Sequence, residues 1–390
     1  MPEYLISSSV GVLAVLAAVT SLFFFLEKKT GWKLFNYFPP LIFIYLTPVA
    51  LSNFGLIPTE SAVYDFMGES ILPTFLVIML LRVDLKMTVK VMGKGIFVML
   101  AGTIGVVIGA PIAFFLVKHG LDAESWKAFG ALAGSWIGGT GNMLAVGQMV
   151  ELDETSANFG YAVIADNAVY LIWLPIMLAS KNLAGWFHKF TGVSDDRLSK
   201  MEEAARSATE VNRKFEMRHF LYLAFLGFAA TTFAIWFSGI LPAFPPYLTA
   251  STYKILLVTI IGISLSFTKA SKIPGSHEIA MALVYLFVAR MGAKADLSNL
   301  SLSIFWFLLG AYIWIFIHGF FIVAAARIFK VDVHTAAIAS AANIGGAASA
   351  PIVAAFHKPA LVPVSILMAL LGYAIGNPAA YIAAILCSLV

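Results

Sequence analysis

The stretch from residue 130 to residue 146 constrains this chain most, because it is apolar enough to enter a membrane and yet carries three close glycines. Gly138, Gly139 and Gly141 stand at its centre, and polar residues flank them. Glycines spaced this closely interrupt a helix rather than continue it. Inside a bilayer, an interrupted helix leaves backbone N–H and C=O groups unpaired, which is tolerated only where the backbone is buried in protein or lines a cavity.

A second stretch of the same kind lies in the other half of the chain. There Gly345 and Gly346 stand between Asn343 and Ser349, again within an apolar run. We expect each glycine-rich segment, about 127–150 and about 334–356, to form two helical arms joined at the glycines.

The composition is that of a polytopic membrane protein. Of 390 residues, 60% are hydrophobic and 12% are charged, whereas soluble domains carry about a quarter charged residues. The first apolar run has no Lys or Arg before it, so we interpret it as a membrane helix rather than a signal peptide. The single cysteine, Cys387, excludes an internal disulfide framework and a thiolate metal site. We therefore expect the lipid bilayer as a partner, no nucleic-acid partner, no organic cofactor and no transition-metal site.

Ten apolar segments approach the roughly 20 residues that a helix needs to cross a bilayer. They are residues 5–26, 39–57, 67–83, 95–117 and 159–180, followed by 219–239, 248–267, 276–293, 301–326 and 361–388. Five precede and five follow the only long charged stretch. The predicted domains are a first repeat over residues 1–180, a cytoplasmic charged linker helix over 181–218, and a second repeat over 219–390.

The distribution of Lys and Arg indicates that the two glycine-rich segments are re-entrant, so that each enters the membrane and returns on the same side. With both segments re-entrant, all but five of the 25 basic residues share one side with the linker. The five exceptions are Lys118, Lys127, Lys254, Arg290 and Lys294. Short cytoplasmic loops collect Lys and Arg, so we expect both termini outside and the linker in the cytoplasm.

Five spans in each half give the two halves opposite orientations. The tripeptide 137–139 matches 344–346, and Asn167 matches Asn377 in the span that follows each glycine break. We therefore predict an all-α polytopic membrane protein of two inverted repeats of five transmembrane helices, each with one glycine-broken re-entrant helical hairpin. The hairpin tips can meet at the midplane, and inverted repeats of this kind are typical of secondary transporters.

The hairpin tips are the predicted substrate site, because a helix N-terminus attracts anionic groups and a helix C-terminus attracts cations. In this interpretation Thr140 caps its arm, and Ser349 caps an arm with Pro351 in its first turn. The alternative is that the glycines only permit close helix packing. The predicted substrate-binding residues are Ser135, Gly138, Gly139, Thr140, Gly141, Asn142, Asn343, Gly345, Gly346 and Ser349.

The predicted cation site consists of Asp166, Asn167 and Asn377. A carboxylate inside a span is costly and usually faces a partner or a wet cavity, and Asp166 lies several residues inside its span. The alternatives are an interhelical hydrogen bond for Asp166 and a proline kink for Asn377. Arg290 ends a span, so we expect it to reach the membrane interface, whereas His318 is expected to be a packed, hydrogen-bonded residue.

The run Gly-Ser-Trp-Ile-Gly-Gly-Thr-Gly-Asn-Met at 134–143 resembles the signature of the YjcL-like family, a bacterial membrane family of unknown function, over nearly the whole chain. More distantly, the paired Gly-Gly segments look like those of the glutamate:sodium symporters and the 2-hydroxycarboxylate transporters. That resemblance implies two inverted five-span repeats, a homodimer and sodium-coupled transport by an elevator motion. The first break, at 138–141, fits the Gly-Gly-x-Gly pattern of these families, whereas the second, at 345–348, lacks its final glycine.

The expected function is secondary active transport, not enzyme catalysis. The expected substrate is a small anionic or zwitterionic metabolite, namely an amino acid, a short peptide or a carboxylate. It would move in symport with Na⁺, and H⁺ is the alternative coupling ion. A second hypothesis is an ion-only sodium/proton exchanger with Asp166 as the carrier, and a third is an intramembrane enzyme.

Overall fold

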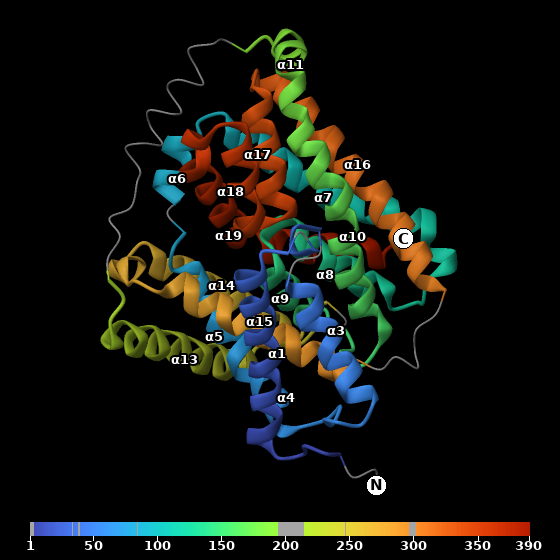
Figure 1. Cartoon of the computed structure of the whole chain (residues 1–390), viewed down its shortest axis with the longest axis vertical. Coiled ribbons are helices and arrows are strands. Elements are labelled where there is room, and N and C mark those ends of the chain that lie inside the picture. The colour runs from blue at the N-terminus through green and yellow to red at the C-terminus, as the bar shows by residue number, and fades with distance from the viewer. Residues whose placement is uncertain are drawn as a thin grey trace.

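The computed structural model describes residues 4–32, 34–37, 40–83, 85–193, 214–245, 247–295 and 302–390. Most of the predicted linker helix at 181–218 lies outside the described residues. Within the described ranges the regular structure is helical, without a β-strand (Figure 1).

The described helices follow one another along the chain in this order. The first half contains α1 (Ser9–Thr30), α2 (Leu34–Tyr37), α3 (Pro40–Asn53), α4 (Ala62–Phe66), α5 (Leu72–Leu80), α6 (Leu85–Met92), α7 (Gly95–Val117), α8 (Ser125–Gly138), α9 (Thr140–Met149), α10 (Ala157–Ala179) and α11 (Ala184–Thr191). The second half contains α13 (Met217–Ile240), α14 (Ala250–Ser266), α15 (Ser276–Lys294), α16 (Ser303–Phe329), α17 (Val333–Ile344), α18 (Gly346–His357) and α19 (Val362–Ser388). A π-helical turn (Met67–Ile71) joins α4 to α5.

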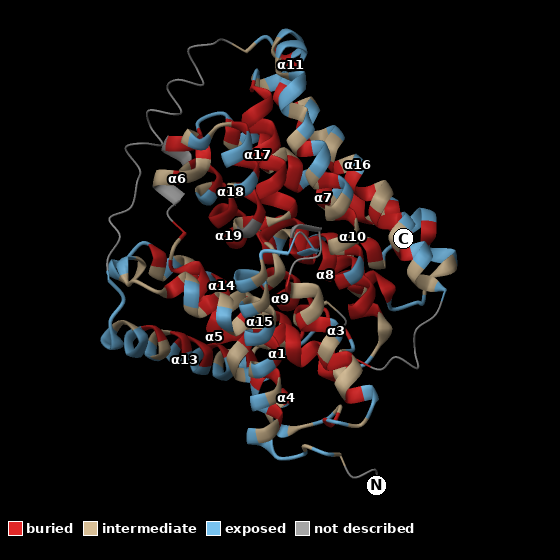
Figure 2. Ribbon diagram, in the orientation of Figure 1, coloured by how far each residue is buried: buried red, intermediate tan, exposed pale blue. Residues whose placement is uncertain are grey.

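Each of the ten predicted spans contains a helix, and the polytopic membrane class is confirmed. Among the described residues, seven helices are long and apolar enough to cross a membrane, and two shorter apolar helices are α3 and α14. The remaining segment is α15, of 19 residues, which carries Glu278 in its first turn and Lys294 in its last. The outer faces of α13 and α16 are exposed, whereas α5, α8 and α17 are almost entirely buried (Figure 2). Exposed apolar faces on long helices are suited to contact with lipid.

The helices pack into two bodies. The hairpin body consists of α7, α8, α9, α10, α16, α17, α18 and α19, and it fills the upper part of Figure 1. The frame consists of α1, α3, α4, α5, α13, α14 and α15, in the lower part of the same view. The two bodies meet chiefly where α9 and α19 contact α14 and α5.

Small residues bring α7 and α16 together at the heart of the hairpin body. A Cβ atom on Gly105 would lie 2.8 Å from Phe321 Cβ, and one on Gly109 would lie 2.4 Å from Trp314 Cδ1. The Trp314 indole N–H donates a hydrogen bond to the Val106 carbonyl oxygen at 2.8 Å. Small residues along one face allow such close approach between apolar helices.

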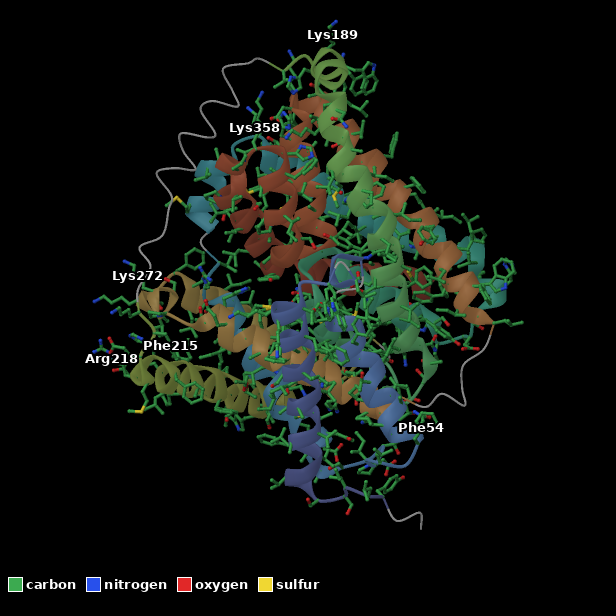
Figure 3. The ribbon with its side chains drawn as sticks, in the orientation of Figure 1. Phe54, Lys189, Phe215, Arg218, Lys272 and Lys358 are labelled. Carbon is green, nitrogen blue, oxygen red and sulfur yellow. The ribbon has the colours of Figure 1, made fainter. Side chains whose placement is uncertain are left out.

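Basic residues gather along one edge of the molecule. Figure 3 shows Lys189, Lys358, Lys272 and Arg218 along that edge, whereas Phe54 lies at the opposite edge. The last turns of α1 and α11 also carry basic side chains, Lys28 and Lys29 in α1 and His188 and Lys189 in α11. Cations near helix C-termini interact favourably with the helix dipole.

We expect Gly292→Ala to destabilise the frame, because a Cβ atom there would lie 2.1 Å from the Tyr45 carbonyl oxygen. Backbone cannot move aside as a flexible side chain can, so α15 would have to separate from α3. Overpacking of this kind costs about 1–3 kcal/mol, which a lower melting temperature in detergent would report.

The matched control is Gly239→Ala on α13, where nothing lies within 4 Å of the new methyl group. This control is expected to be neutral or slightly stabilising, since Ala favours helix over Gly. Equal melting temperatures for the two variants would contradict the close contact between α3 and α15.

Candidate functional site

The first glycine-rich segment is a helical hairpin that turns at Gly139. This residue has φ 78° and ψ −177°, a conformation that is essentially restricted to glycine. The two arms then run antiparallel: a Cβ atom on Gly134 would lie 2.6 Å from the Asn142 carbonyl oxygen, and one on Gly130 would lie 3.7 Å from Val146 Cγ1. The glycines of α8 thus allow α9 to pack directly on its backbone.

The second glycine-rich segment has the same construction. The helix α17 ends at Ile344, and α18 begins at Gly346, which has φ 56°. At the open end of this hairpin, His334 Nδ1 lies 3.1 Å from His357 Nδ1. The chain therefore reverses between these two residues, and the arms end side by side.

The tips of the two hairpins touch each other. A Cβ atom on Gly346 would lie 3.6 Å from Gly139 Cα. The Tyr373 ring lies against both tips, at 3.6 Å from a Cβ on Gly139 and 3.8 Å from one on Gly346. Tyr170 approaches the second tip, 3.1 Å from a Cβ on Gly345. Two segments far apart in the sequence thus form one junction with two tyrosines beside it.

Asp166 is attached to the first tip. The Ser135 hydroxyl donates a hydrogen bond to Asp166 Oδ2 at 2.9 Å, and the Trp136 indole N–H donates one to Oδ1 at 3.0 Å. Both donors come from the last turn of α8, and the carboxylate on α10 is half-buried. Asn167 does not join this group through its amide nitrogen, which donates to the carbonyl oxygen of Val163 in its own helix.

Asn142 on α9 and Asn377 on α19 are fully buried amides. Asn142 donates to the Tyr373 carbonyl oxygen at 3.1 Å, and Asn377 donates to Thr259 Oγ1 at 2.8 Å. Among the described residues neither side-chain oxygen accepts a hydrogen bond. The Thr259 hydroxyl already donates to the Ile255 carbonyl oxygen, so it cannot serve Asn377 Oδ1. Such buried acceptors normally have a partner, and an unhydrated cation or a water would supply one.

Other predicted tip residues have structural contacts. In the orientation that satisfies its amide, Asn343 accepts from Thr103 Oγ1 on α7 at 2.9 Å and donates to the Met99 carbonyl oxygen at 3.0 Å. A Cβ on Gly141 would lie 3.1 Å from Met79 Sδ, so this glycine allows contact with the frame. Two of the predicted site residues, Gly138 and Asn142, pack together, since a Cβ on Gly138 would lie 2.7 Å from Asn142 Cγ.

The predicted caps differ from the structure. The N-cap position of α9 is Gly139, which provides no side-chain cap, and Thr140 is the first helical residue. The helix α18 begins at Gly346, so Ser349 and Pro351 lie within its first two turns rather than at its start. The glycines themselves carry the breaks, because a positive φ at each tip ends one helix and allows the next to begin.

His318 is a satisfied core residue, as predicted. Its Nδ1 lies 3.0 Å from the Gly102 carbonyl oxygen, and its Nε2 lies 2.9 Å from Ser340 Oγ. Since a carbonyl oxygen only accepts, Nδ1 carries the proton and Nε2 accepts from the Ser340 hydroxyl. The Trp173 indole N–H donates to the same Ser340 oxygen, which completes the network with a neutral imidazole.

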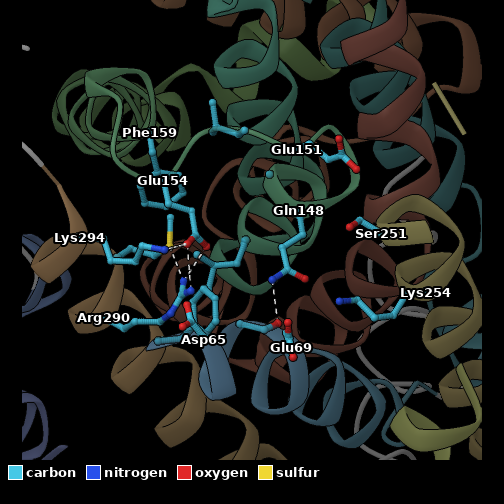
Figure 4. Close-up of a pocket in the computed structure, with 16 residues that line it drawn as sticks. Asp65, Glu69, Gln148, Glu151, Glu154, Phe159, Ser251, Lys254, Arg290 and Lys294 are labelled. Carbon is cyan, nitrogen blue, oxygen red and sulfur yellow. Dashed lines mark hydrogen bonds and ion pairs between the residues drawn. The ribbon is translucent and has the colours of Figure 1, made fainter. Parts of the chain in front are cut away.

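A polar cavity of about 390 Å³ lies at the open end of the first hairpin, between the hairpin and the frame (Figure 4). Its wall includes Asp65, Gly68, Glu69, Gln148, Glu151, Glu154, Ser251, Lys254, Arg290 and Lys294. None of these was among the predicted site residues. The sequence nevertheless contained a signal for this cavity. Lys254, Arg290 and Lys294 are three of the five basic residues that lie on the side opposite the linker in the predicted topology.

Arg290 does not extend to the surface as predicted, since its side chain is buried in the protein. Its Nη1 and Nη2 lie 2.6 and 2.9 Å from the two carboxylate oxygens of Glu154, and its Nε donates to the Tyr64 carbonyl oxygen at 2.6 Å. Lys294 Nζ lies 2.7 Å from Glu154 Oε2. The bidentate geometry is the strong form of this pair, and it joins the hairpin body to α15 of the frame.

The two cations decide the ionisation of Glu154, which lies in the loop between α9 and α10. Burial by itself raises the pKa of this carboxyl, but the hydrogen bonds and charges of Arg290 and Lys294 outweigh burial. The pKa is therefore held below its ordinary value, and Glu154 is a carboxylate at neutral pH.

We expect Glu154→Gln to lower the melting temperature at pH 7, because it leaves Arg290 buried without its carboxylate. Breaking a buried ion pair costs about 3 kcal/mol or more. Since the folded pKa is lowered, the stabilisation is fully present above the ordinary carboxyl pKa of about 4.3. It is lost as the pH falls through the lower pKa of the folded state. The difference between wild type and variant should therefore shrink only in acid, which melting curves across pH would measure.

The control for this experiment is Glu124→Gln, which removes a surface partner of Lys127. Exposed pairs contribute little, so its melting temperature should follow that of wild type at every pH. A Glu154→Gln variant that melts like this control at pH 7 would contradict the stabilising pair.

Comparison with known proteins places this architecture in a family. The family model described as "Protein of unknown function (DUF819)" matches residues 14–389. The chain is also 26% identical over 379 residues to the "Uncharacterized membrane protein YjcL" of Bacillus subtilis (strain 168), covering 94% of this chain and 93% of that protein. Because the match spans nearly all of the sequence, the chain belongs to the DUF819 family of membrane proteins.

Proposed function

We propose that this membrane protein is a secondary active transporter, a sodium-coupled symporter of a small anionic or zwitterionic metabolite. The observation that carries the proposal is the junction of the two hairpin tips at Gly139 and Gly346, with the Asp166 carboxylate bonded to the first tip. Helix breaks expose backbone donors and acceptors inside an apolar protein, which suits a site for a polar solute. Amino acids, short peptides and carboxylates are the proposed substrate classes.

The packing of the frame supports an inverted repeat. If the two halves are matched in chain order, α1, α3 and α5 correspond to α13, α14 and α15. The contact between α3 and α15 then corresponds to the contact between α14 and α5. Likewise, the contact between α1 and α15 corresponds to the contact between α13 and α5. The hairpin body follows the same rule, since α8 packs on α10 and α17 packs on α19. A two-fold relation between the halves accounts for all of these pairs.

In this proposal both hairpins are re-entrant, at about 127–150 and about 334–356, and they enter from opposite sides of a bacterial inner membrane. The edge that carries Lys189, Lys358, Lys272 and Arg218 (Figure 3) is then cytoplasmic, in agreement with the positive-inside rule. Both termini and the polar cavity face outside, and the linker lies in the cytoplasm.

The two bodies favour an elevator mechanism, in which the hairpin body moves relative to the frame. The buried pair of Arg290 with Glu154 holds the position seen here. Several other contacts between the bodies are single polar interactions, which are easier to exchange than an interlocked apolar core. The Thr252 hydroxyl donates to the Met149 carbonyl oxygen at 2.8 Å, and Gln148 Nε2 donates to the Gly68 carbonyl oxygen at 2.8 Å. By the resemblance to the glutamate:sodium symporters and the 2-hydroxycarboxylate transporters, we also propose a homodimer, in which the frame does not move.

Sodium is the proposed coupling ion, and H⁺ is the alternative. Asp166 supplies the carboxylate, and the buried oxygen of Asn377 lacks a partner among the described residues, so both are suited to a hard cation that prefers oxygen ligands. We keep Asn167 in the proposed cation site through its side-chain oxygen, since only its nitrogen is engaged with its own helix. No catalytic role is assigned to any residue.

We expect Asp166→Asn to abolish sodium coupling while leaving folded protein in the membrane, because the amide keeps the size of the side chain and removes its charge. In the wild type, NaCl should raise the melting temperature above that in KCl of equal ionic strength, since a ligand of the folded state stabilises it. One class among amino acids, dipeptides and dicarboxylates should enlarge that shift. In the variant the sodium-specific shift should be absent, and so should solute-driven uptake of radioactive sodium into proteoliposomes.

The matched control is Asp122→Asn, an exposed aspartate in the loop before α8, which should behave like wild type. Full sodium dependence in Asp166→Asn would remove Asp166 from the cation site. Sodium flux driven by a pH gradient without any organic solute would instead favour the ion-only exchanger. Chemical turnover of a solute in the absence of gradients would indicate an intramembrane enzyme.

A further inference from the structure

The polar cavity at the open end of the first hairpin is separate from the hairpin tips. Leu144, Gly147 and Gln148 on α9 line it, and Gln148 is nine residues from Gly139, or about 13 Å along a helix. The cavity volume of about 390 Å³ lies within the range of sites for small organic ligands. Binding in this cavity therefore does not require the tip site or transport.

One group of charges in the wall is paired within the protein, although its two cations and one carboxylate leave a net charge of +1. The carboxylate of Glu154 is shared between Arg290 and Lys294, at 2.6 to 2.9 Å. Arg290 also donates to the Tyr64 carbonyl oxygen and approaches the Met291 sulfur at 3.2 Å. With two cations and one carboxylate already in contact, this wall is a preformed and rigid support rather than an open anion site.

A second group of polar side chains is left without such contacts. In the part of the chain that the structure describes, Lys254 is half-buried and makes no hydrogen bond, and Asp65, Glu69 and Glu151 are exposed. Lys254 and Glu69 attract each other electrostatically across the cavity without a direct ion pair. Figure 4 shows Lys254 reaching into the cavity on the side of Glu69 and Gln148. The Gln148 side-chain oxygen is buried and accepts no hydrogen bond from a described residue.

The polar groups of this second set indicate which charges a ligand should carry. Three carboxylates and a buried amide oxygen call for hydrogen-bond donors with positive charge, whereas the single half-buried ammonium of Lys254 calls for an anionic group. A dicarboxylate would bring two negative charges to a set that already carries an excess of them. A simple amine would leave Lys254 without a partner.

We propose that this cavity binds a small solute that carries both an ammonium and a carboxylate group, an amino acid being the simplest. The carboxylate pairs with Lys254, and the ammonium group pairs with Glu69 and the Gln148 side-chain oxygen. Asp65 and Glu151, exposed at the rim, attract the positively charged end by long-range electrostatics. The site lies where the hairpin body meets the frame, so an occupied cavity bridges the two bodies.

The test is equilibrium binding to the purified full-length protein in detergent, in potassium buffer without sodium. Each of the twenty standard amino acids is first screened by its effect on the melting temperature, and the best one is titrated by calorimetry. Its analogues that lack the amino group or the carboxyl group are titrated alongside it. We expect the parent amino acid to bind and both analogues to bind at least about tenfold more weakly, because each loses one charge-assisted contact.

Two variants locate the ligand. Lys254→Gln and Glu69→Gln should each weaken binding of the amino acid by about tenfold or more. The matched controls are Lys272→Gln and Glu278→Gln, which alter exposed residues at the other end of the frame and should bind as wild type does. Melting curves without ligand check that all four variants are folded.

Three results would overturn the assignment. The first is that none of the twenty amino acids binds, and the second is that binding is unaffected by both cavity variants. The third is binding that is lost in Asp166→Asn but kept in Lys254→Gln, which would place the ligand at the hairpin tips. Since none of these measurements uses sodium or a gradient, a failure of coupled transport would not affect them.

Discussion

Backbone groups that a helix break leaves unpaired are the constraint on which this structure depends. In an apolar environment they must be enclosed by protein or meet a polar ligand. Here the break at Gly139 lies against the break at Gly346, and the Tyr373 ring lies beside both. Packing two breaks against each other shields both from lipid at a single place, and it requires that α8, α9, α17 and α18 come together from opposite halves of the chain.

Close helix contact is the means by which this junction is held. Gly138 approaches the Gly372 carbonyl oxygen, and Asn142 lies against Gly376, with distances that leave no space for a Cβ atom. Glycines likewise allow close contact between α7 and α16 and between α3 and α15. By contrast, the boundary between the hairpin body and the frame is crossed by polar contacts and by the buried pair of Arg290 with Glu154. A buried ion pair adds little net stability but is costly to break, so it holds one relative position of the two bodies.

Much of the candidate site follows from local sequence. Three glycines within four positions predict a helix break wherever they occur in an apolar run, and an aspartate inside a span predicts a polar partner; Ser135 and Trp136 are that partner. Other assignments depend on which helix face meets which neighbour. Asn343 is engaged with Thr103 on α7, and Asn167 donates to its own helix, although both lie at positions that chain order places beside the tips.

The sequence by itself determined the membrane class, the apolar segments and the two breaks, because composition and glycine spacing act over a single turn or span. Tertiary structure alone decided which charges are buried. Arg290 ends a helix, as interfacial arginines do, yet it is buried because Glu154, 136 residues away, neutralises it. The cavity beside this pair is likewise assembled from α4, α9, α14 and α15. The free energy of a charge depends on its neighbours in space, and no local pattern specifies neighbours that far apart in the chain.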